Sequence, residues 1–314
     1  MVVPTNTADR DGAEQYNTLL AFWLGALVYG LYCVLFLHSV KIMVRRRRSH
    51  RAWPAMVFSC ATYLIFILTT IYMGLNISRF LYAFSPEWTE ASNGKLPIYH
   101  LRDYTPSPRF AKMVIMAILI WLGDALTASS FRFLSIFRCF IIWDKNWWVV
   151  LAPIILWTFS VSNSSIVTME FHNPNTLPPQ LVKSLNGIIF PVNIALICLT
   201  TGLITFRIGH QYRLSRAAGL RRHGRGVGLL TIIKIVVESA MIFAFHQISI
   251  CIAFYIGNPG LRQIFTETLV SSIGATFALI TIRVEDSKHE ATSKFTLPHI
   301  YSAKTVSRLR AGTI

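Results

Sequence analysis

Ionisable side chains inside long apolar runs are the residues of this sequence that could do chemistry. Asp124 stands within the run MVIMAILIWLGDALTASSFRFLSIF, which also contains Arg132, and Arg138 follows directly after it. At about 100° per residue, Asp124 and Arg138 lie within roughly 60° of each other around a helix axis, so they share one face. Because an ionised group in an apolar helix is costly, that face should be turned toward other protein or a water-filled cavity.

A second pair of charges, Lys234 and Glu238, stands one helical turn apart within the apolar run 229–255. Side chains at this spacing meet on one face of a helix and can form an ion pair. Arg132 or Arg138 could be a third partner, because both approach the same end of the predicted bundle. We interpret this charge network as a structural ion pair that fixes helix packing or, alternatively, as a lock that couples the helices.

Uncharged polar groups and one carboxylate form a third set. They lie at similar depth, toward the end of the predicted bundle that is opposite to the Lys234–Glu238 pair. They are Ser160, Asn163, Asn193, His246, Gln247 and Glu267. Pro191 lies in the same run as Asn193 and can kink that helix. Two interpretations stay open: the wall of a ligand pocket, or hydrogen bonds between packed helices. The candidates for a pocket wall are Asp124, Asn163, Asn193, His246 and Glu267.

The elements that position these residues are long apolar helices. Of the 314 residues, 53% are hydrophobic and only 14% are charged, whereas soluble domains carry about 25% charged residues. Runs long enough to cross a bilayer cover roughly 19–40, 54–75, 113–137, 149–169, 186–207, 229–255 and 261–282. The predicted fold is therefore all-α, a seven-transmembrane helix bundle over 19–282. A polar segment, 1–18, precedes it, and a polar tail, 283–314, which we expect to be mobile, follows it.

Basic residues indicate the orientation of this bundle. They gather in 41–51, in 207–225 and in the tail from Arg283. Because Lys and Arg favour the cytoplasmic side, the N-terminus is predicted outside and the C-terminus in the cytosol. The net charge of +16 is therefore assigned to topology and to anionic lipid head groups, and no nucleic-acid partner is expected.

The long connection 76–112 falls on the outer side in this orientation. It is rich in aromatic residues, and we expect it to pack over the outer mouth of the bundle. Asn76-Ile77-Ser78 has the pattern of a glycosylation acceptor on the same side.

Motifs of catalysis and of metal binding are missing from the sequence. The nine histidines are scattered, and no nucleophile elbow, phosphate-binding loop or dinucleotide fingerprint occurs. None of the five cysteines lies in a candidate outer loop. We therefore expect no enzymatic activity, no cofactor and no metal.

Three segments carry a family resemblance. They are GDAL…FRCFIIWDKNWWVVLAP (Gly123 to Pro153), VVESAMIFAF (Val236 to Phe245) and LITIRVED (Leu279 to Asp286). All three resemble segments of an uncharacterised seven-transmembrane family expanded in mushroom-forming basidiomycete fungi. The resemblance implies an architecture and no activity. That family often has a tyrosine where Phe137 stands here.

The topology is also similar to that of G-protein-coupled receptors, by analogy only. Arg138-Cys139-Phe140 is a loose counterpart of the Asp-Arg-Tyr motif, and the seventh run lacks Asn-Pro-x-x-Tyr.

Three functions remain open at this point. The first is a receptor-like sensor of a small or lipid ligand, with a cytosolic signalling partner. The second is a transporter or channel-like protein that uses Asp124, Glu238 and Glu267 as stations for protons or a cation. The third is a membrane scaffold without a small ligand. The plasma membrane is favoured over internal membranes.

Overall fold

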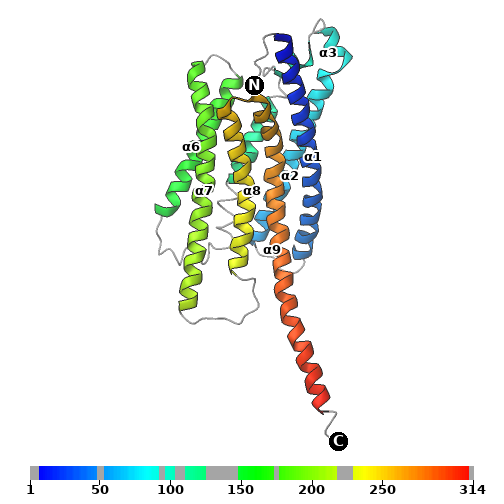
Figure 1. Ribbon diagram of the computed structural model, residues 1–314, viewed down its shortest axis with the longest axis vertical. Helices are drawn as coiled ribbons and strands as arrows, with labels where there is room; N and C mark the ends of the chain where they lie inside the picture. The colour runs from blue at the N-terminus through cyan, green and yellow to red at the C-terminus, as the bar shows by residue number, and fades with distance from the viewer. Residues whose placement is uncertain are drawn as a thin grey trace.

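The computed structural model describes residues 7–47, 53–91, 96–102, 110–124, 148–172, 177–217 and 229–310. Within these ranges every regular element is a helix and no strand occurs. The all-α prediction is therefore confirmed for the described chain. The long helices run up and down the molecule as a bundle (Figure 1).

The helices are listed here in chain order. They are α1 (Thr7–Arg47), α2 (Trp53–Ala83), the short α3 (Pro86–Ala91) and α4 (Pro97–Arg102), α6 (Trp148–His172), α7 (Pro179–Ala217), α8 (Leu229–Ile256) and α9 (Pro259–Arg310). A further helical segment covers residues 110–124, and we call it the 110–124 helix.

Several of these helices are long and apolar enough to cross a membrane. Five qualify among the described residues: Arg10–Arg45, Ser59–Ala83, Leu151–Glu170, Pro179–Leu203 and Pro259–Asp286. A shorter apolar stretch, Met241–Ile256, lies on α8. Because each backbone polar group of a helix is bonded within the helix, such segments are suited to lipid. The chain is thus a multi-pass membrane protein. The predicted span 113–137 is described only as far as Asp124.

Two helices extend beyond the predicted runs. α1 already begins at Thr7, inside the segment expected to precede the first span. α9 continues to Arg310, so residues 283–310 of the expected mobile tail are helical (Figure 1). From Arg283 to Leu297 the sequence contains neither glycine nor proline, so nothing in its local chemistry ends the helix at the membrane boundary.

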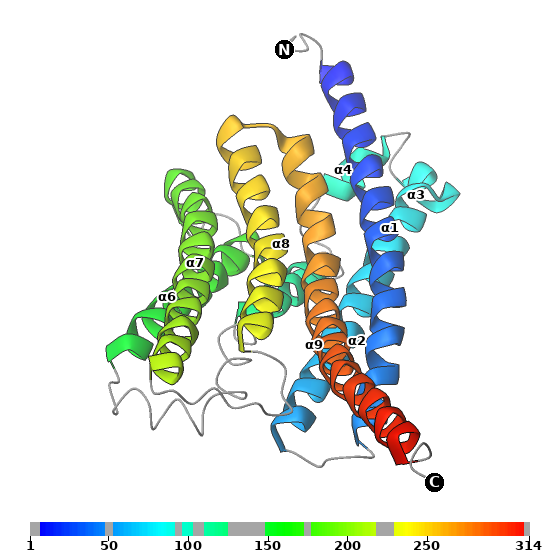
Figure 2. The same ribbon diagram turned by 60° about the horizontal axis from the view of Figure 1, so that its bottom comes forward.

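α9 is the central element of the bundle. It packs along α1 and also contacts α8 and α2, whereas α7 lies between α8 and α6 (Figures 1 and 2). About 56% of its spanning window is buried, against 17–33% for the other four spanning windows. Its buried residues Leu269, Val270, Ile273 and Phe277 belong to the main hydrophobic cluster. A movement of α9 would therefore change its contacts with α1, α2 and α8.

Gly274 allows the close approach of α1 to α9. A Cβ atom at Gly274 would clash with the ring of Tyr32, which is fully buried against α9. Tyr32 also packs edge-to-face on Phe36 and Phe66. Small residues of this kind allow membrane helices to pack backbone to backbone.

The turn between α8 and α9 follows directly from its sequence. Gly257 adopts a positive φ of 74°, a conformation that glycine reaches without strain. The Oδ1 atom of Asn258 accepts a hydrogen bond of 3.2 Å from the backbone N–H of Leu261 and so caps α9. Pro259 opens the helix, where its missing N–H costs nothing. This turn fixes the position of α8 along the bundle axis relative to α9.

The connection 76–112 is mostly helical. α2 continues to Ala83, and α3 and α4 follow. Ile98 and Leu101 of α4 are buried in a small cluster with Phe80 and Ala83 of α2. A guanidinium N–H of Arg79 donates to the Leu101 carbonyl oxygen at 3.1 Å. The connection therefore packs against this end of the bundle.

Candidate functional site

A cavity of about 690 Å³ lies at the end of the bundle where α1 and α9 begin. Its wall takes residues from α1, α2, α4, the 110–124 helix, α6, α7, α8 and α9. Pockets for drug-sized ligands commonly measure about 300–1,000 Å³. The cavity is therefore the candidate functional site.

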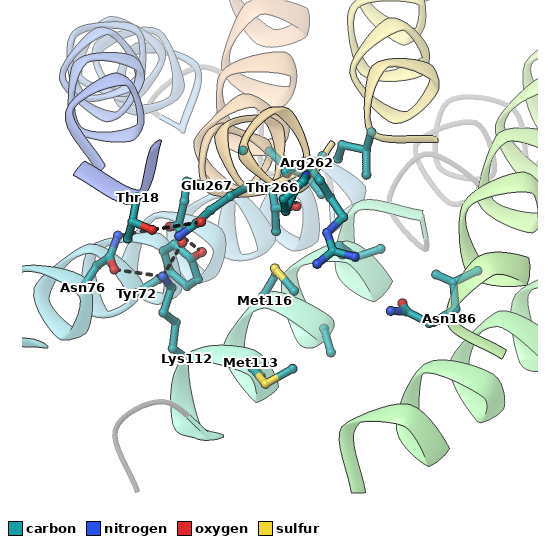
Figure 3. A pocket seen from close by; sticks show the side chains of 18 of the residues that line it. Thr18, Tyr72, Asn76, Lys112, Met113, Met116, Asn186, Arg262, Thr266 and Glu267 are labelled. Carbon is teal, nitrogen blue, oxygen red and sulfur yellow. Dashed lines mark hydrogen bonds and ion pairs between the residues drawn. The ribbon is translucent and has the colours of Figure 1, made fainter. Parts of the chain in front are cut away.

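A charged hydrogen-bond network forms one side of this cavity (Figure 3). The ammonium Nζ of Lys112 lies 2.5 Å from Oε1 of Glu267 and donates to Oδ1 of Asn76 at 2.8 Å. Oε2 of Glu267 accepts from Nδ2 of Asn76 and from the Tyr72 hydroxyl, each at 3.0 Å. The network thus joins α2, the 110–124 helix and α9.

Each member of this network is largely buried and has its polar atoms paired. The exposed fraction is 8% for Lys112, 3% for Asn76 and 1% for Tyr72. The Lys112 ammonium also lies 5.0 Å from the centre of the Tyr72 ring, within the range of a cation–π contact. A buried ion pair tolerates its desolvation when further hydrogen bonds satisfy its atoms. The network is therefore a closed unit that can hold three helices together.

The helical period brings the members of this unit to one place. Tyr72 and Asn76 are one turn apart on α2 and share a face. Lys112 stands in the first turn of the 110–124 helix, and Glu267 is among the early turns of α9. These positions lie at the same end of the bundle because α2 ends there while the other two helices begin.

The opposite side of the cavity carries a buried donor that has no acceptor among the described residues. Nε2 of Gln247 is buried and has no hydrogen-bond partner in the described chain. Oδ1 of Asn193 accepts from the Ser160 hydroxyl at 2.6 Å. Figure 3 shows the guanidinium of Arg262 extending into the space between Met116 and Asn186.

The cavity includes two of the five pocket candidates from the sequence, Asn193 and Glu267. Three candidates are not among its lining residues as the structure describes them. Asn163 donates through Nδ2 to the Leu185 carbonyl oxygen at 3.0 Å and ties α6 to α7. Nε2 of His246 lies 2.8 Å from the Phe265 carbonyl oxygen, to which it must donate, and ties α8 to α9.

Asp124 is the third candidate outside the cavity wall. It is 4% exposed, and its Oδ2 atom has no partner among the described residues. Its neighbour Gly123 packs closely on Ile273 of α9, so Asp124 lies about 9 Å deeper than Glu267 at the helical rise from 267 to 273. The carboxylate singled out by the sequence is thus buried below the cavity.

The predicted charge network is described only in part. Glu238 of α8 pairs with Arg283 of α9, with Oε2 and Nη1 2.7 Å apart. Lys234 lies on α8, but its side chain is outside the described residues, as are Arg132 and Arg138. The Lys234–Glu238 pair therefore stays a prediction.

Several site residues were missed by sequence reasoning. Lys112 was assigned to the outer connection because it directly precedes an apolar run, and Arg283 was counted only as a topology charge. Asn76 was noted only as a glycosylation acceptor, yet its side-chain amide is buried and fully used in the network. The available signal was a lone lysine at the start of an apolar run, which needs a nearby carboxylate when it is buried.

Metal sites and disulfide bonds are not found among the residues that the structure describes. Among the described residues, no group of three or more His, Cys, Asp and Glu side chains could hold a metal ion. The four cysteines that the structure describes are free thiols. Comparison of the chain with protein-family models, with curated proteins and with solved structures finds no match.

Proposed function

We propose that this multi-pass membrane protein is a receptor-like sensor of a small or lipid ligand. In this proposal the bundle has seven spans, with the N-terminus outside and the C-terminus in the cytosol of a plasma-membrane protein. The cavity then opens toward the outside, and the basic segments contact anionic lipid head groups on the inner side. Support comes from a cavity of ligand size whose wall holds a closed charge network.

The single observation that carries the proposal is that α9 bears both charged contacts. Glu267 in the cavity wall and Arg283 in the pair with Glu238 stand on the same helix. They are about 24 Å apart at the rise of an α-helix. A packed helix moves as a rigid element, so a change at the cavity end reaches the other end.

The mechanism follows from competition between the ligand and Glu267 for Lys112. A ligand that draws Lys112 away from Glu267 loosens the 110–124 helix from α9. α9 can then shift relative to α8, where Glu238 and Arg283 meet. A cytosolic signalling partner would bind the basic segment 207–225.

The test measures the distance between two inner helix ends. Spin labels go on cysteines introduced at the exposed residues Arg213 of α7 and Asp286 of α9, in a background without other reactive cysteines. Double electron–electron resonance in lipid nanodiscs compares the label distances in the wild type with those in the Glu267→Gln variant. This substitution breaks the Lys112–Glu267 pair without a ligand. We expect Glu267→Gln to shift or broaden the distance distribution.

The control for this measurement is Lys183→Gln, at an exposed position of α7 that does not line the cavity. It should leave the distribution unchanged. Identical distributions for the wild type and Glu267→Gln would rule out coupling through α9.

A transporter is the second candidate function, favoured by one observation. Asp124 is buried below the cavity with an unpaired Oδ2 atom among the described residues, and intramembrane carboxylates often carry protons or cations. In vesicles, this function predicts a pH-dependent flux that Asp124→Asn abolishes. A scaffold without a ligand gives no reason for a cavity of this size.

A further inference from the structure

The two sides of the cavity differ in how far their polar groups are paired. On the side of α2 and the 110–124 helix, the Lys112 charge is met by Glu267 and each carboxylate oxygen is occupied. On the side of α7, α8 and the start of α9, the Nε2 donor of Gln247 has no acceptor among the described residues. Four polar residues of that side carry side-chain donors, and we call them the donor wall: Asn186, Asn193, Gln247 and Arg262.

Gln247 gives the strongest indication that the donor wall awaits a partner. Its side chain is 1% exposed, it lines the cavity, and Nε2 has no partner within the described ranges. A buried donor without an acceptor loses its hydrogen bonds to water without replacement, so native proteins rarely leave one. His246, the neighbour of Gln247 on α8, bonds to Phe265 of α9. Gln247 therefore lies near the level of Phe265, about one helical turn deeper than Arg262.

Arg262 adds a charge to the same side. Its guanidinium extends into the cavity (Figure 3), and the guanidinium carbon lies over the Phe254 ring, 5.9 Å from the ring centre. As far as the structure describes it, the cavity wall holds Arg10, Arg79, Lys112 and Arg262 against Glu14 and Glu267. Cations therefore outnumber carboxylates, and the electrostatic potential favours an anion.

Apolar side chains complete the lining. Met113, Met116 and Ile120 of the 110–124 helix, together with Phe190 of α7, face the cavity. Methionines adapt their shape to apolar ligands. Such a lining with a few polar groups at one side fits a ligand that has both a charged and an apolar part.

We propose that the cavity binds an amphipathic anion, with a carboxylate or phosphate head group at Arg262. Asn186 and Gln247 donate further hydrogen bonds to the oxygens of the head group, and the apolar body lies against Met116 and Phe190. This inference rests on the proposed ligand-sensing function and names the class of ligand.

The test uses the full chain in nanodiscs of zwitterionic phosphatidylcholine, with dansylaminoundecanoate as a fluorescent anionic probe. Partition into lipid is subtracted with empty nanodiscs. The competitors are dodecanoate, dodecyl phosphate, dodecanol and dodecyltrimethylammonium. We expect saturable binding that both anions displace, whereas dodecanol and the cation do not. The relative potency of dodecanoate and dodecyl phosphate identifies the head group.

Variants test the role of the donor wall. Because a hydrogen bond to a charged group is worth about 1.5–3 kcal/mol, Arg262→Gln should weaken probe binding by about tenfold or more. Arg262→Lys keeps the charge and should lose less affinity, and Gln247→Met should weaken binding severalfold. Arg213→Gln removes an exposed charge of α7 outside the cavity and should leave the affinity unchanged.

The outcomes separate this inference from the proposed function. If dodecanol and the cation displace the probe as well as the anions do, the cavity binds ligands but is not selective for anions, and the inference is wrong. Unchanged affinity in a folded Arg262→Gln variant also overturns it. If none of the amphiphiles binds, the inference fails, while the distance measurement on Glu267→Gln still decides whether the cavity is coupled to the inner end.

Discussion

Lys112 and Glu267 stand 155 positions apart in the chain, yet their charged atoms are 2.5 Å apart. The pair ties the start of the 110–124 helix to α9, the most buried of the spanning helices. Asn76 bonds to both partners and brings α2 into the same contact. Stability at this end of the bundle and the proposed ligand sensing thus depend on the same two charges.

Breaking this pair from one side should be costly. Lys112→Met leaves the buried Glu267 carboxylate without its cation, and loss of one partner of a buried ion pair costs about 3–5 kcal/mol. We expect a marked fall in the thermal unfolding midpoint in detergent, measured by cysteine labelling. The double variant Lys112→Met with Glu267→Gln should recover much of the loss, because no unpaired charge remains.

The matched control for this cycle is Lys183→Gln, which removes an exposed lysine of α7 and should change the midpoint little. Additive losses in the double variant would show that the two side chains do not act as a pair.

A methyl group at Gly274 should destabilise the α1–α9 contact. Gly274→Ala pushes a Cβ atom into the Tyr32 ring, and overpacking of this kind costs about 1–3 kcal/mol. Gly202→Ala on α7 is the matched control, because nothing lies within 4 Å of its added Cβ and alanine favours a helix. Both variants are compared by thermal unfolding. Equal midpoints would mean that α1 does not pack closely on α9 at this position.

The Glu238–Arg283 pair should contribute more to helix position than to stability. Its side chains are 44% and 37% exposed, and exposed ion pairs typically contribute about 0–1 kcal/mol. Arg283→Gln should therefore shift the unfolding midpoint only slightly, yet alter the label distance between α7 and α9. The charge-reversed double variant, Glu238→Arg with Arg283→Glu, should restore the distance. A distance unaffected by Arg283→Gln would remove this pair from the mechanism.

Filling the cavity should block ligand binding without unfolding the protein. Met116 lines the cavity and is shown beside it in Figure 3, so Met116→Trp places a larger ring in the space. We expect loss of saturable dansylaminoundecanoate binding with an unfolding midpoint near that of the wild type. Phe159→Trp, on the exposed surface of α6, enlarges a ring outside the cavity and should bind the probe normally. Full binding by Met116→Trp would place the ligand elsewhere.

The proposed orientation has a direct test in intact cells. An epitope tag before Met1 should be stained without permeabilisation, and a tag after Ile314 only after it. The physical reason is the excess of Lys and Arg in 41–51, in 207–225 and in the tail, which favours the cytosolic side. The reverse staining pattern would mean that the bundle has the opposite orientation and that the cavity lies on the inner side.

Local chemistry in the sequence determined the elements of this protein. Long apolar runs predict helices that satisfy their own backbone groups in lipid, and six of the seven predicted runs lie wholly inside helices of the structure. The turn at Gly257 and Pro259 also follows from residue type alone. Of the pocket candidates named from the sequence, Glu267 and Asn193 line the cavity, where a polar group in an apolar run finds a polar environment.

Only the tertiary structure decided which polar groups meet. Lys112 pairs with Glu267, and Glu238 with Arg283, from helices far apart in the chain. Asn163 and His246 are used in helix–helix hydrogen bonds, and Asp124 is buried below the cavity. Periodicity gives the face of a residue on its own helix. The rotation and level of one helix against another arise from packing of the whole bundle, so a single sequence does not specify the partner of a buried charge.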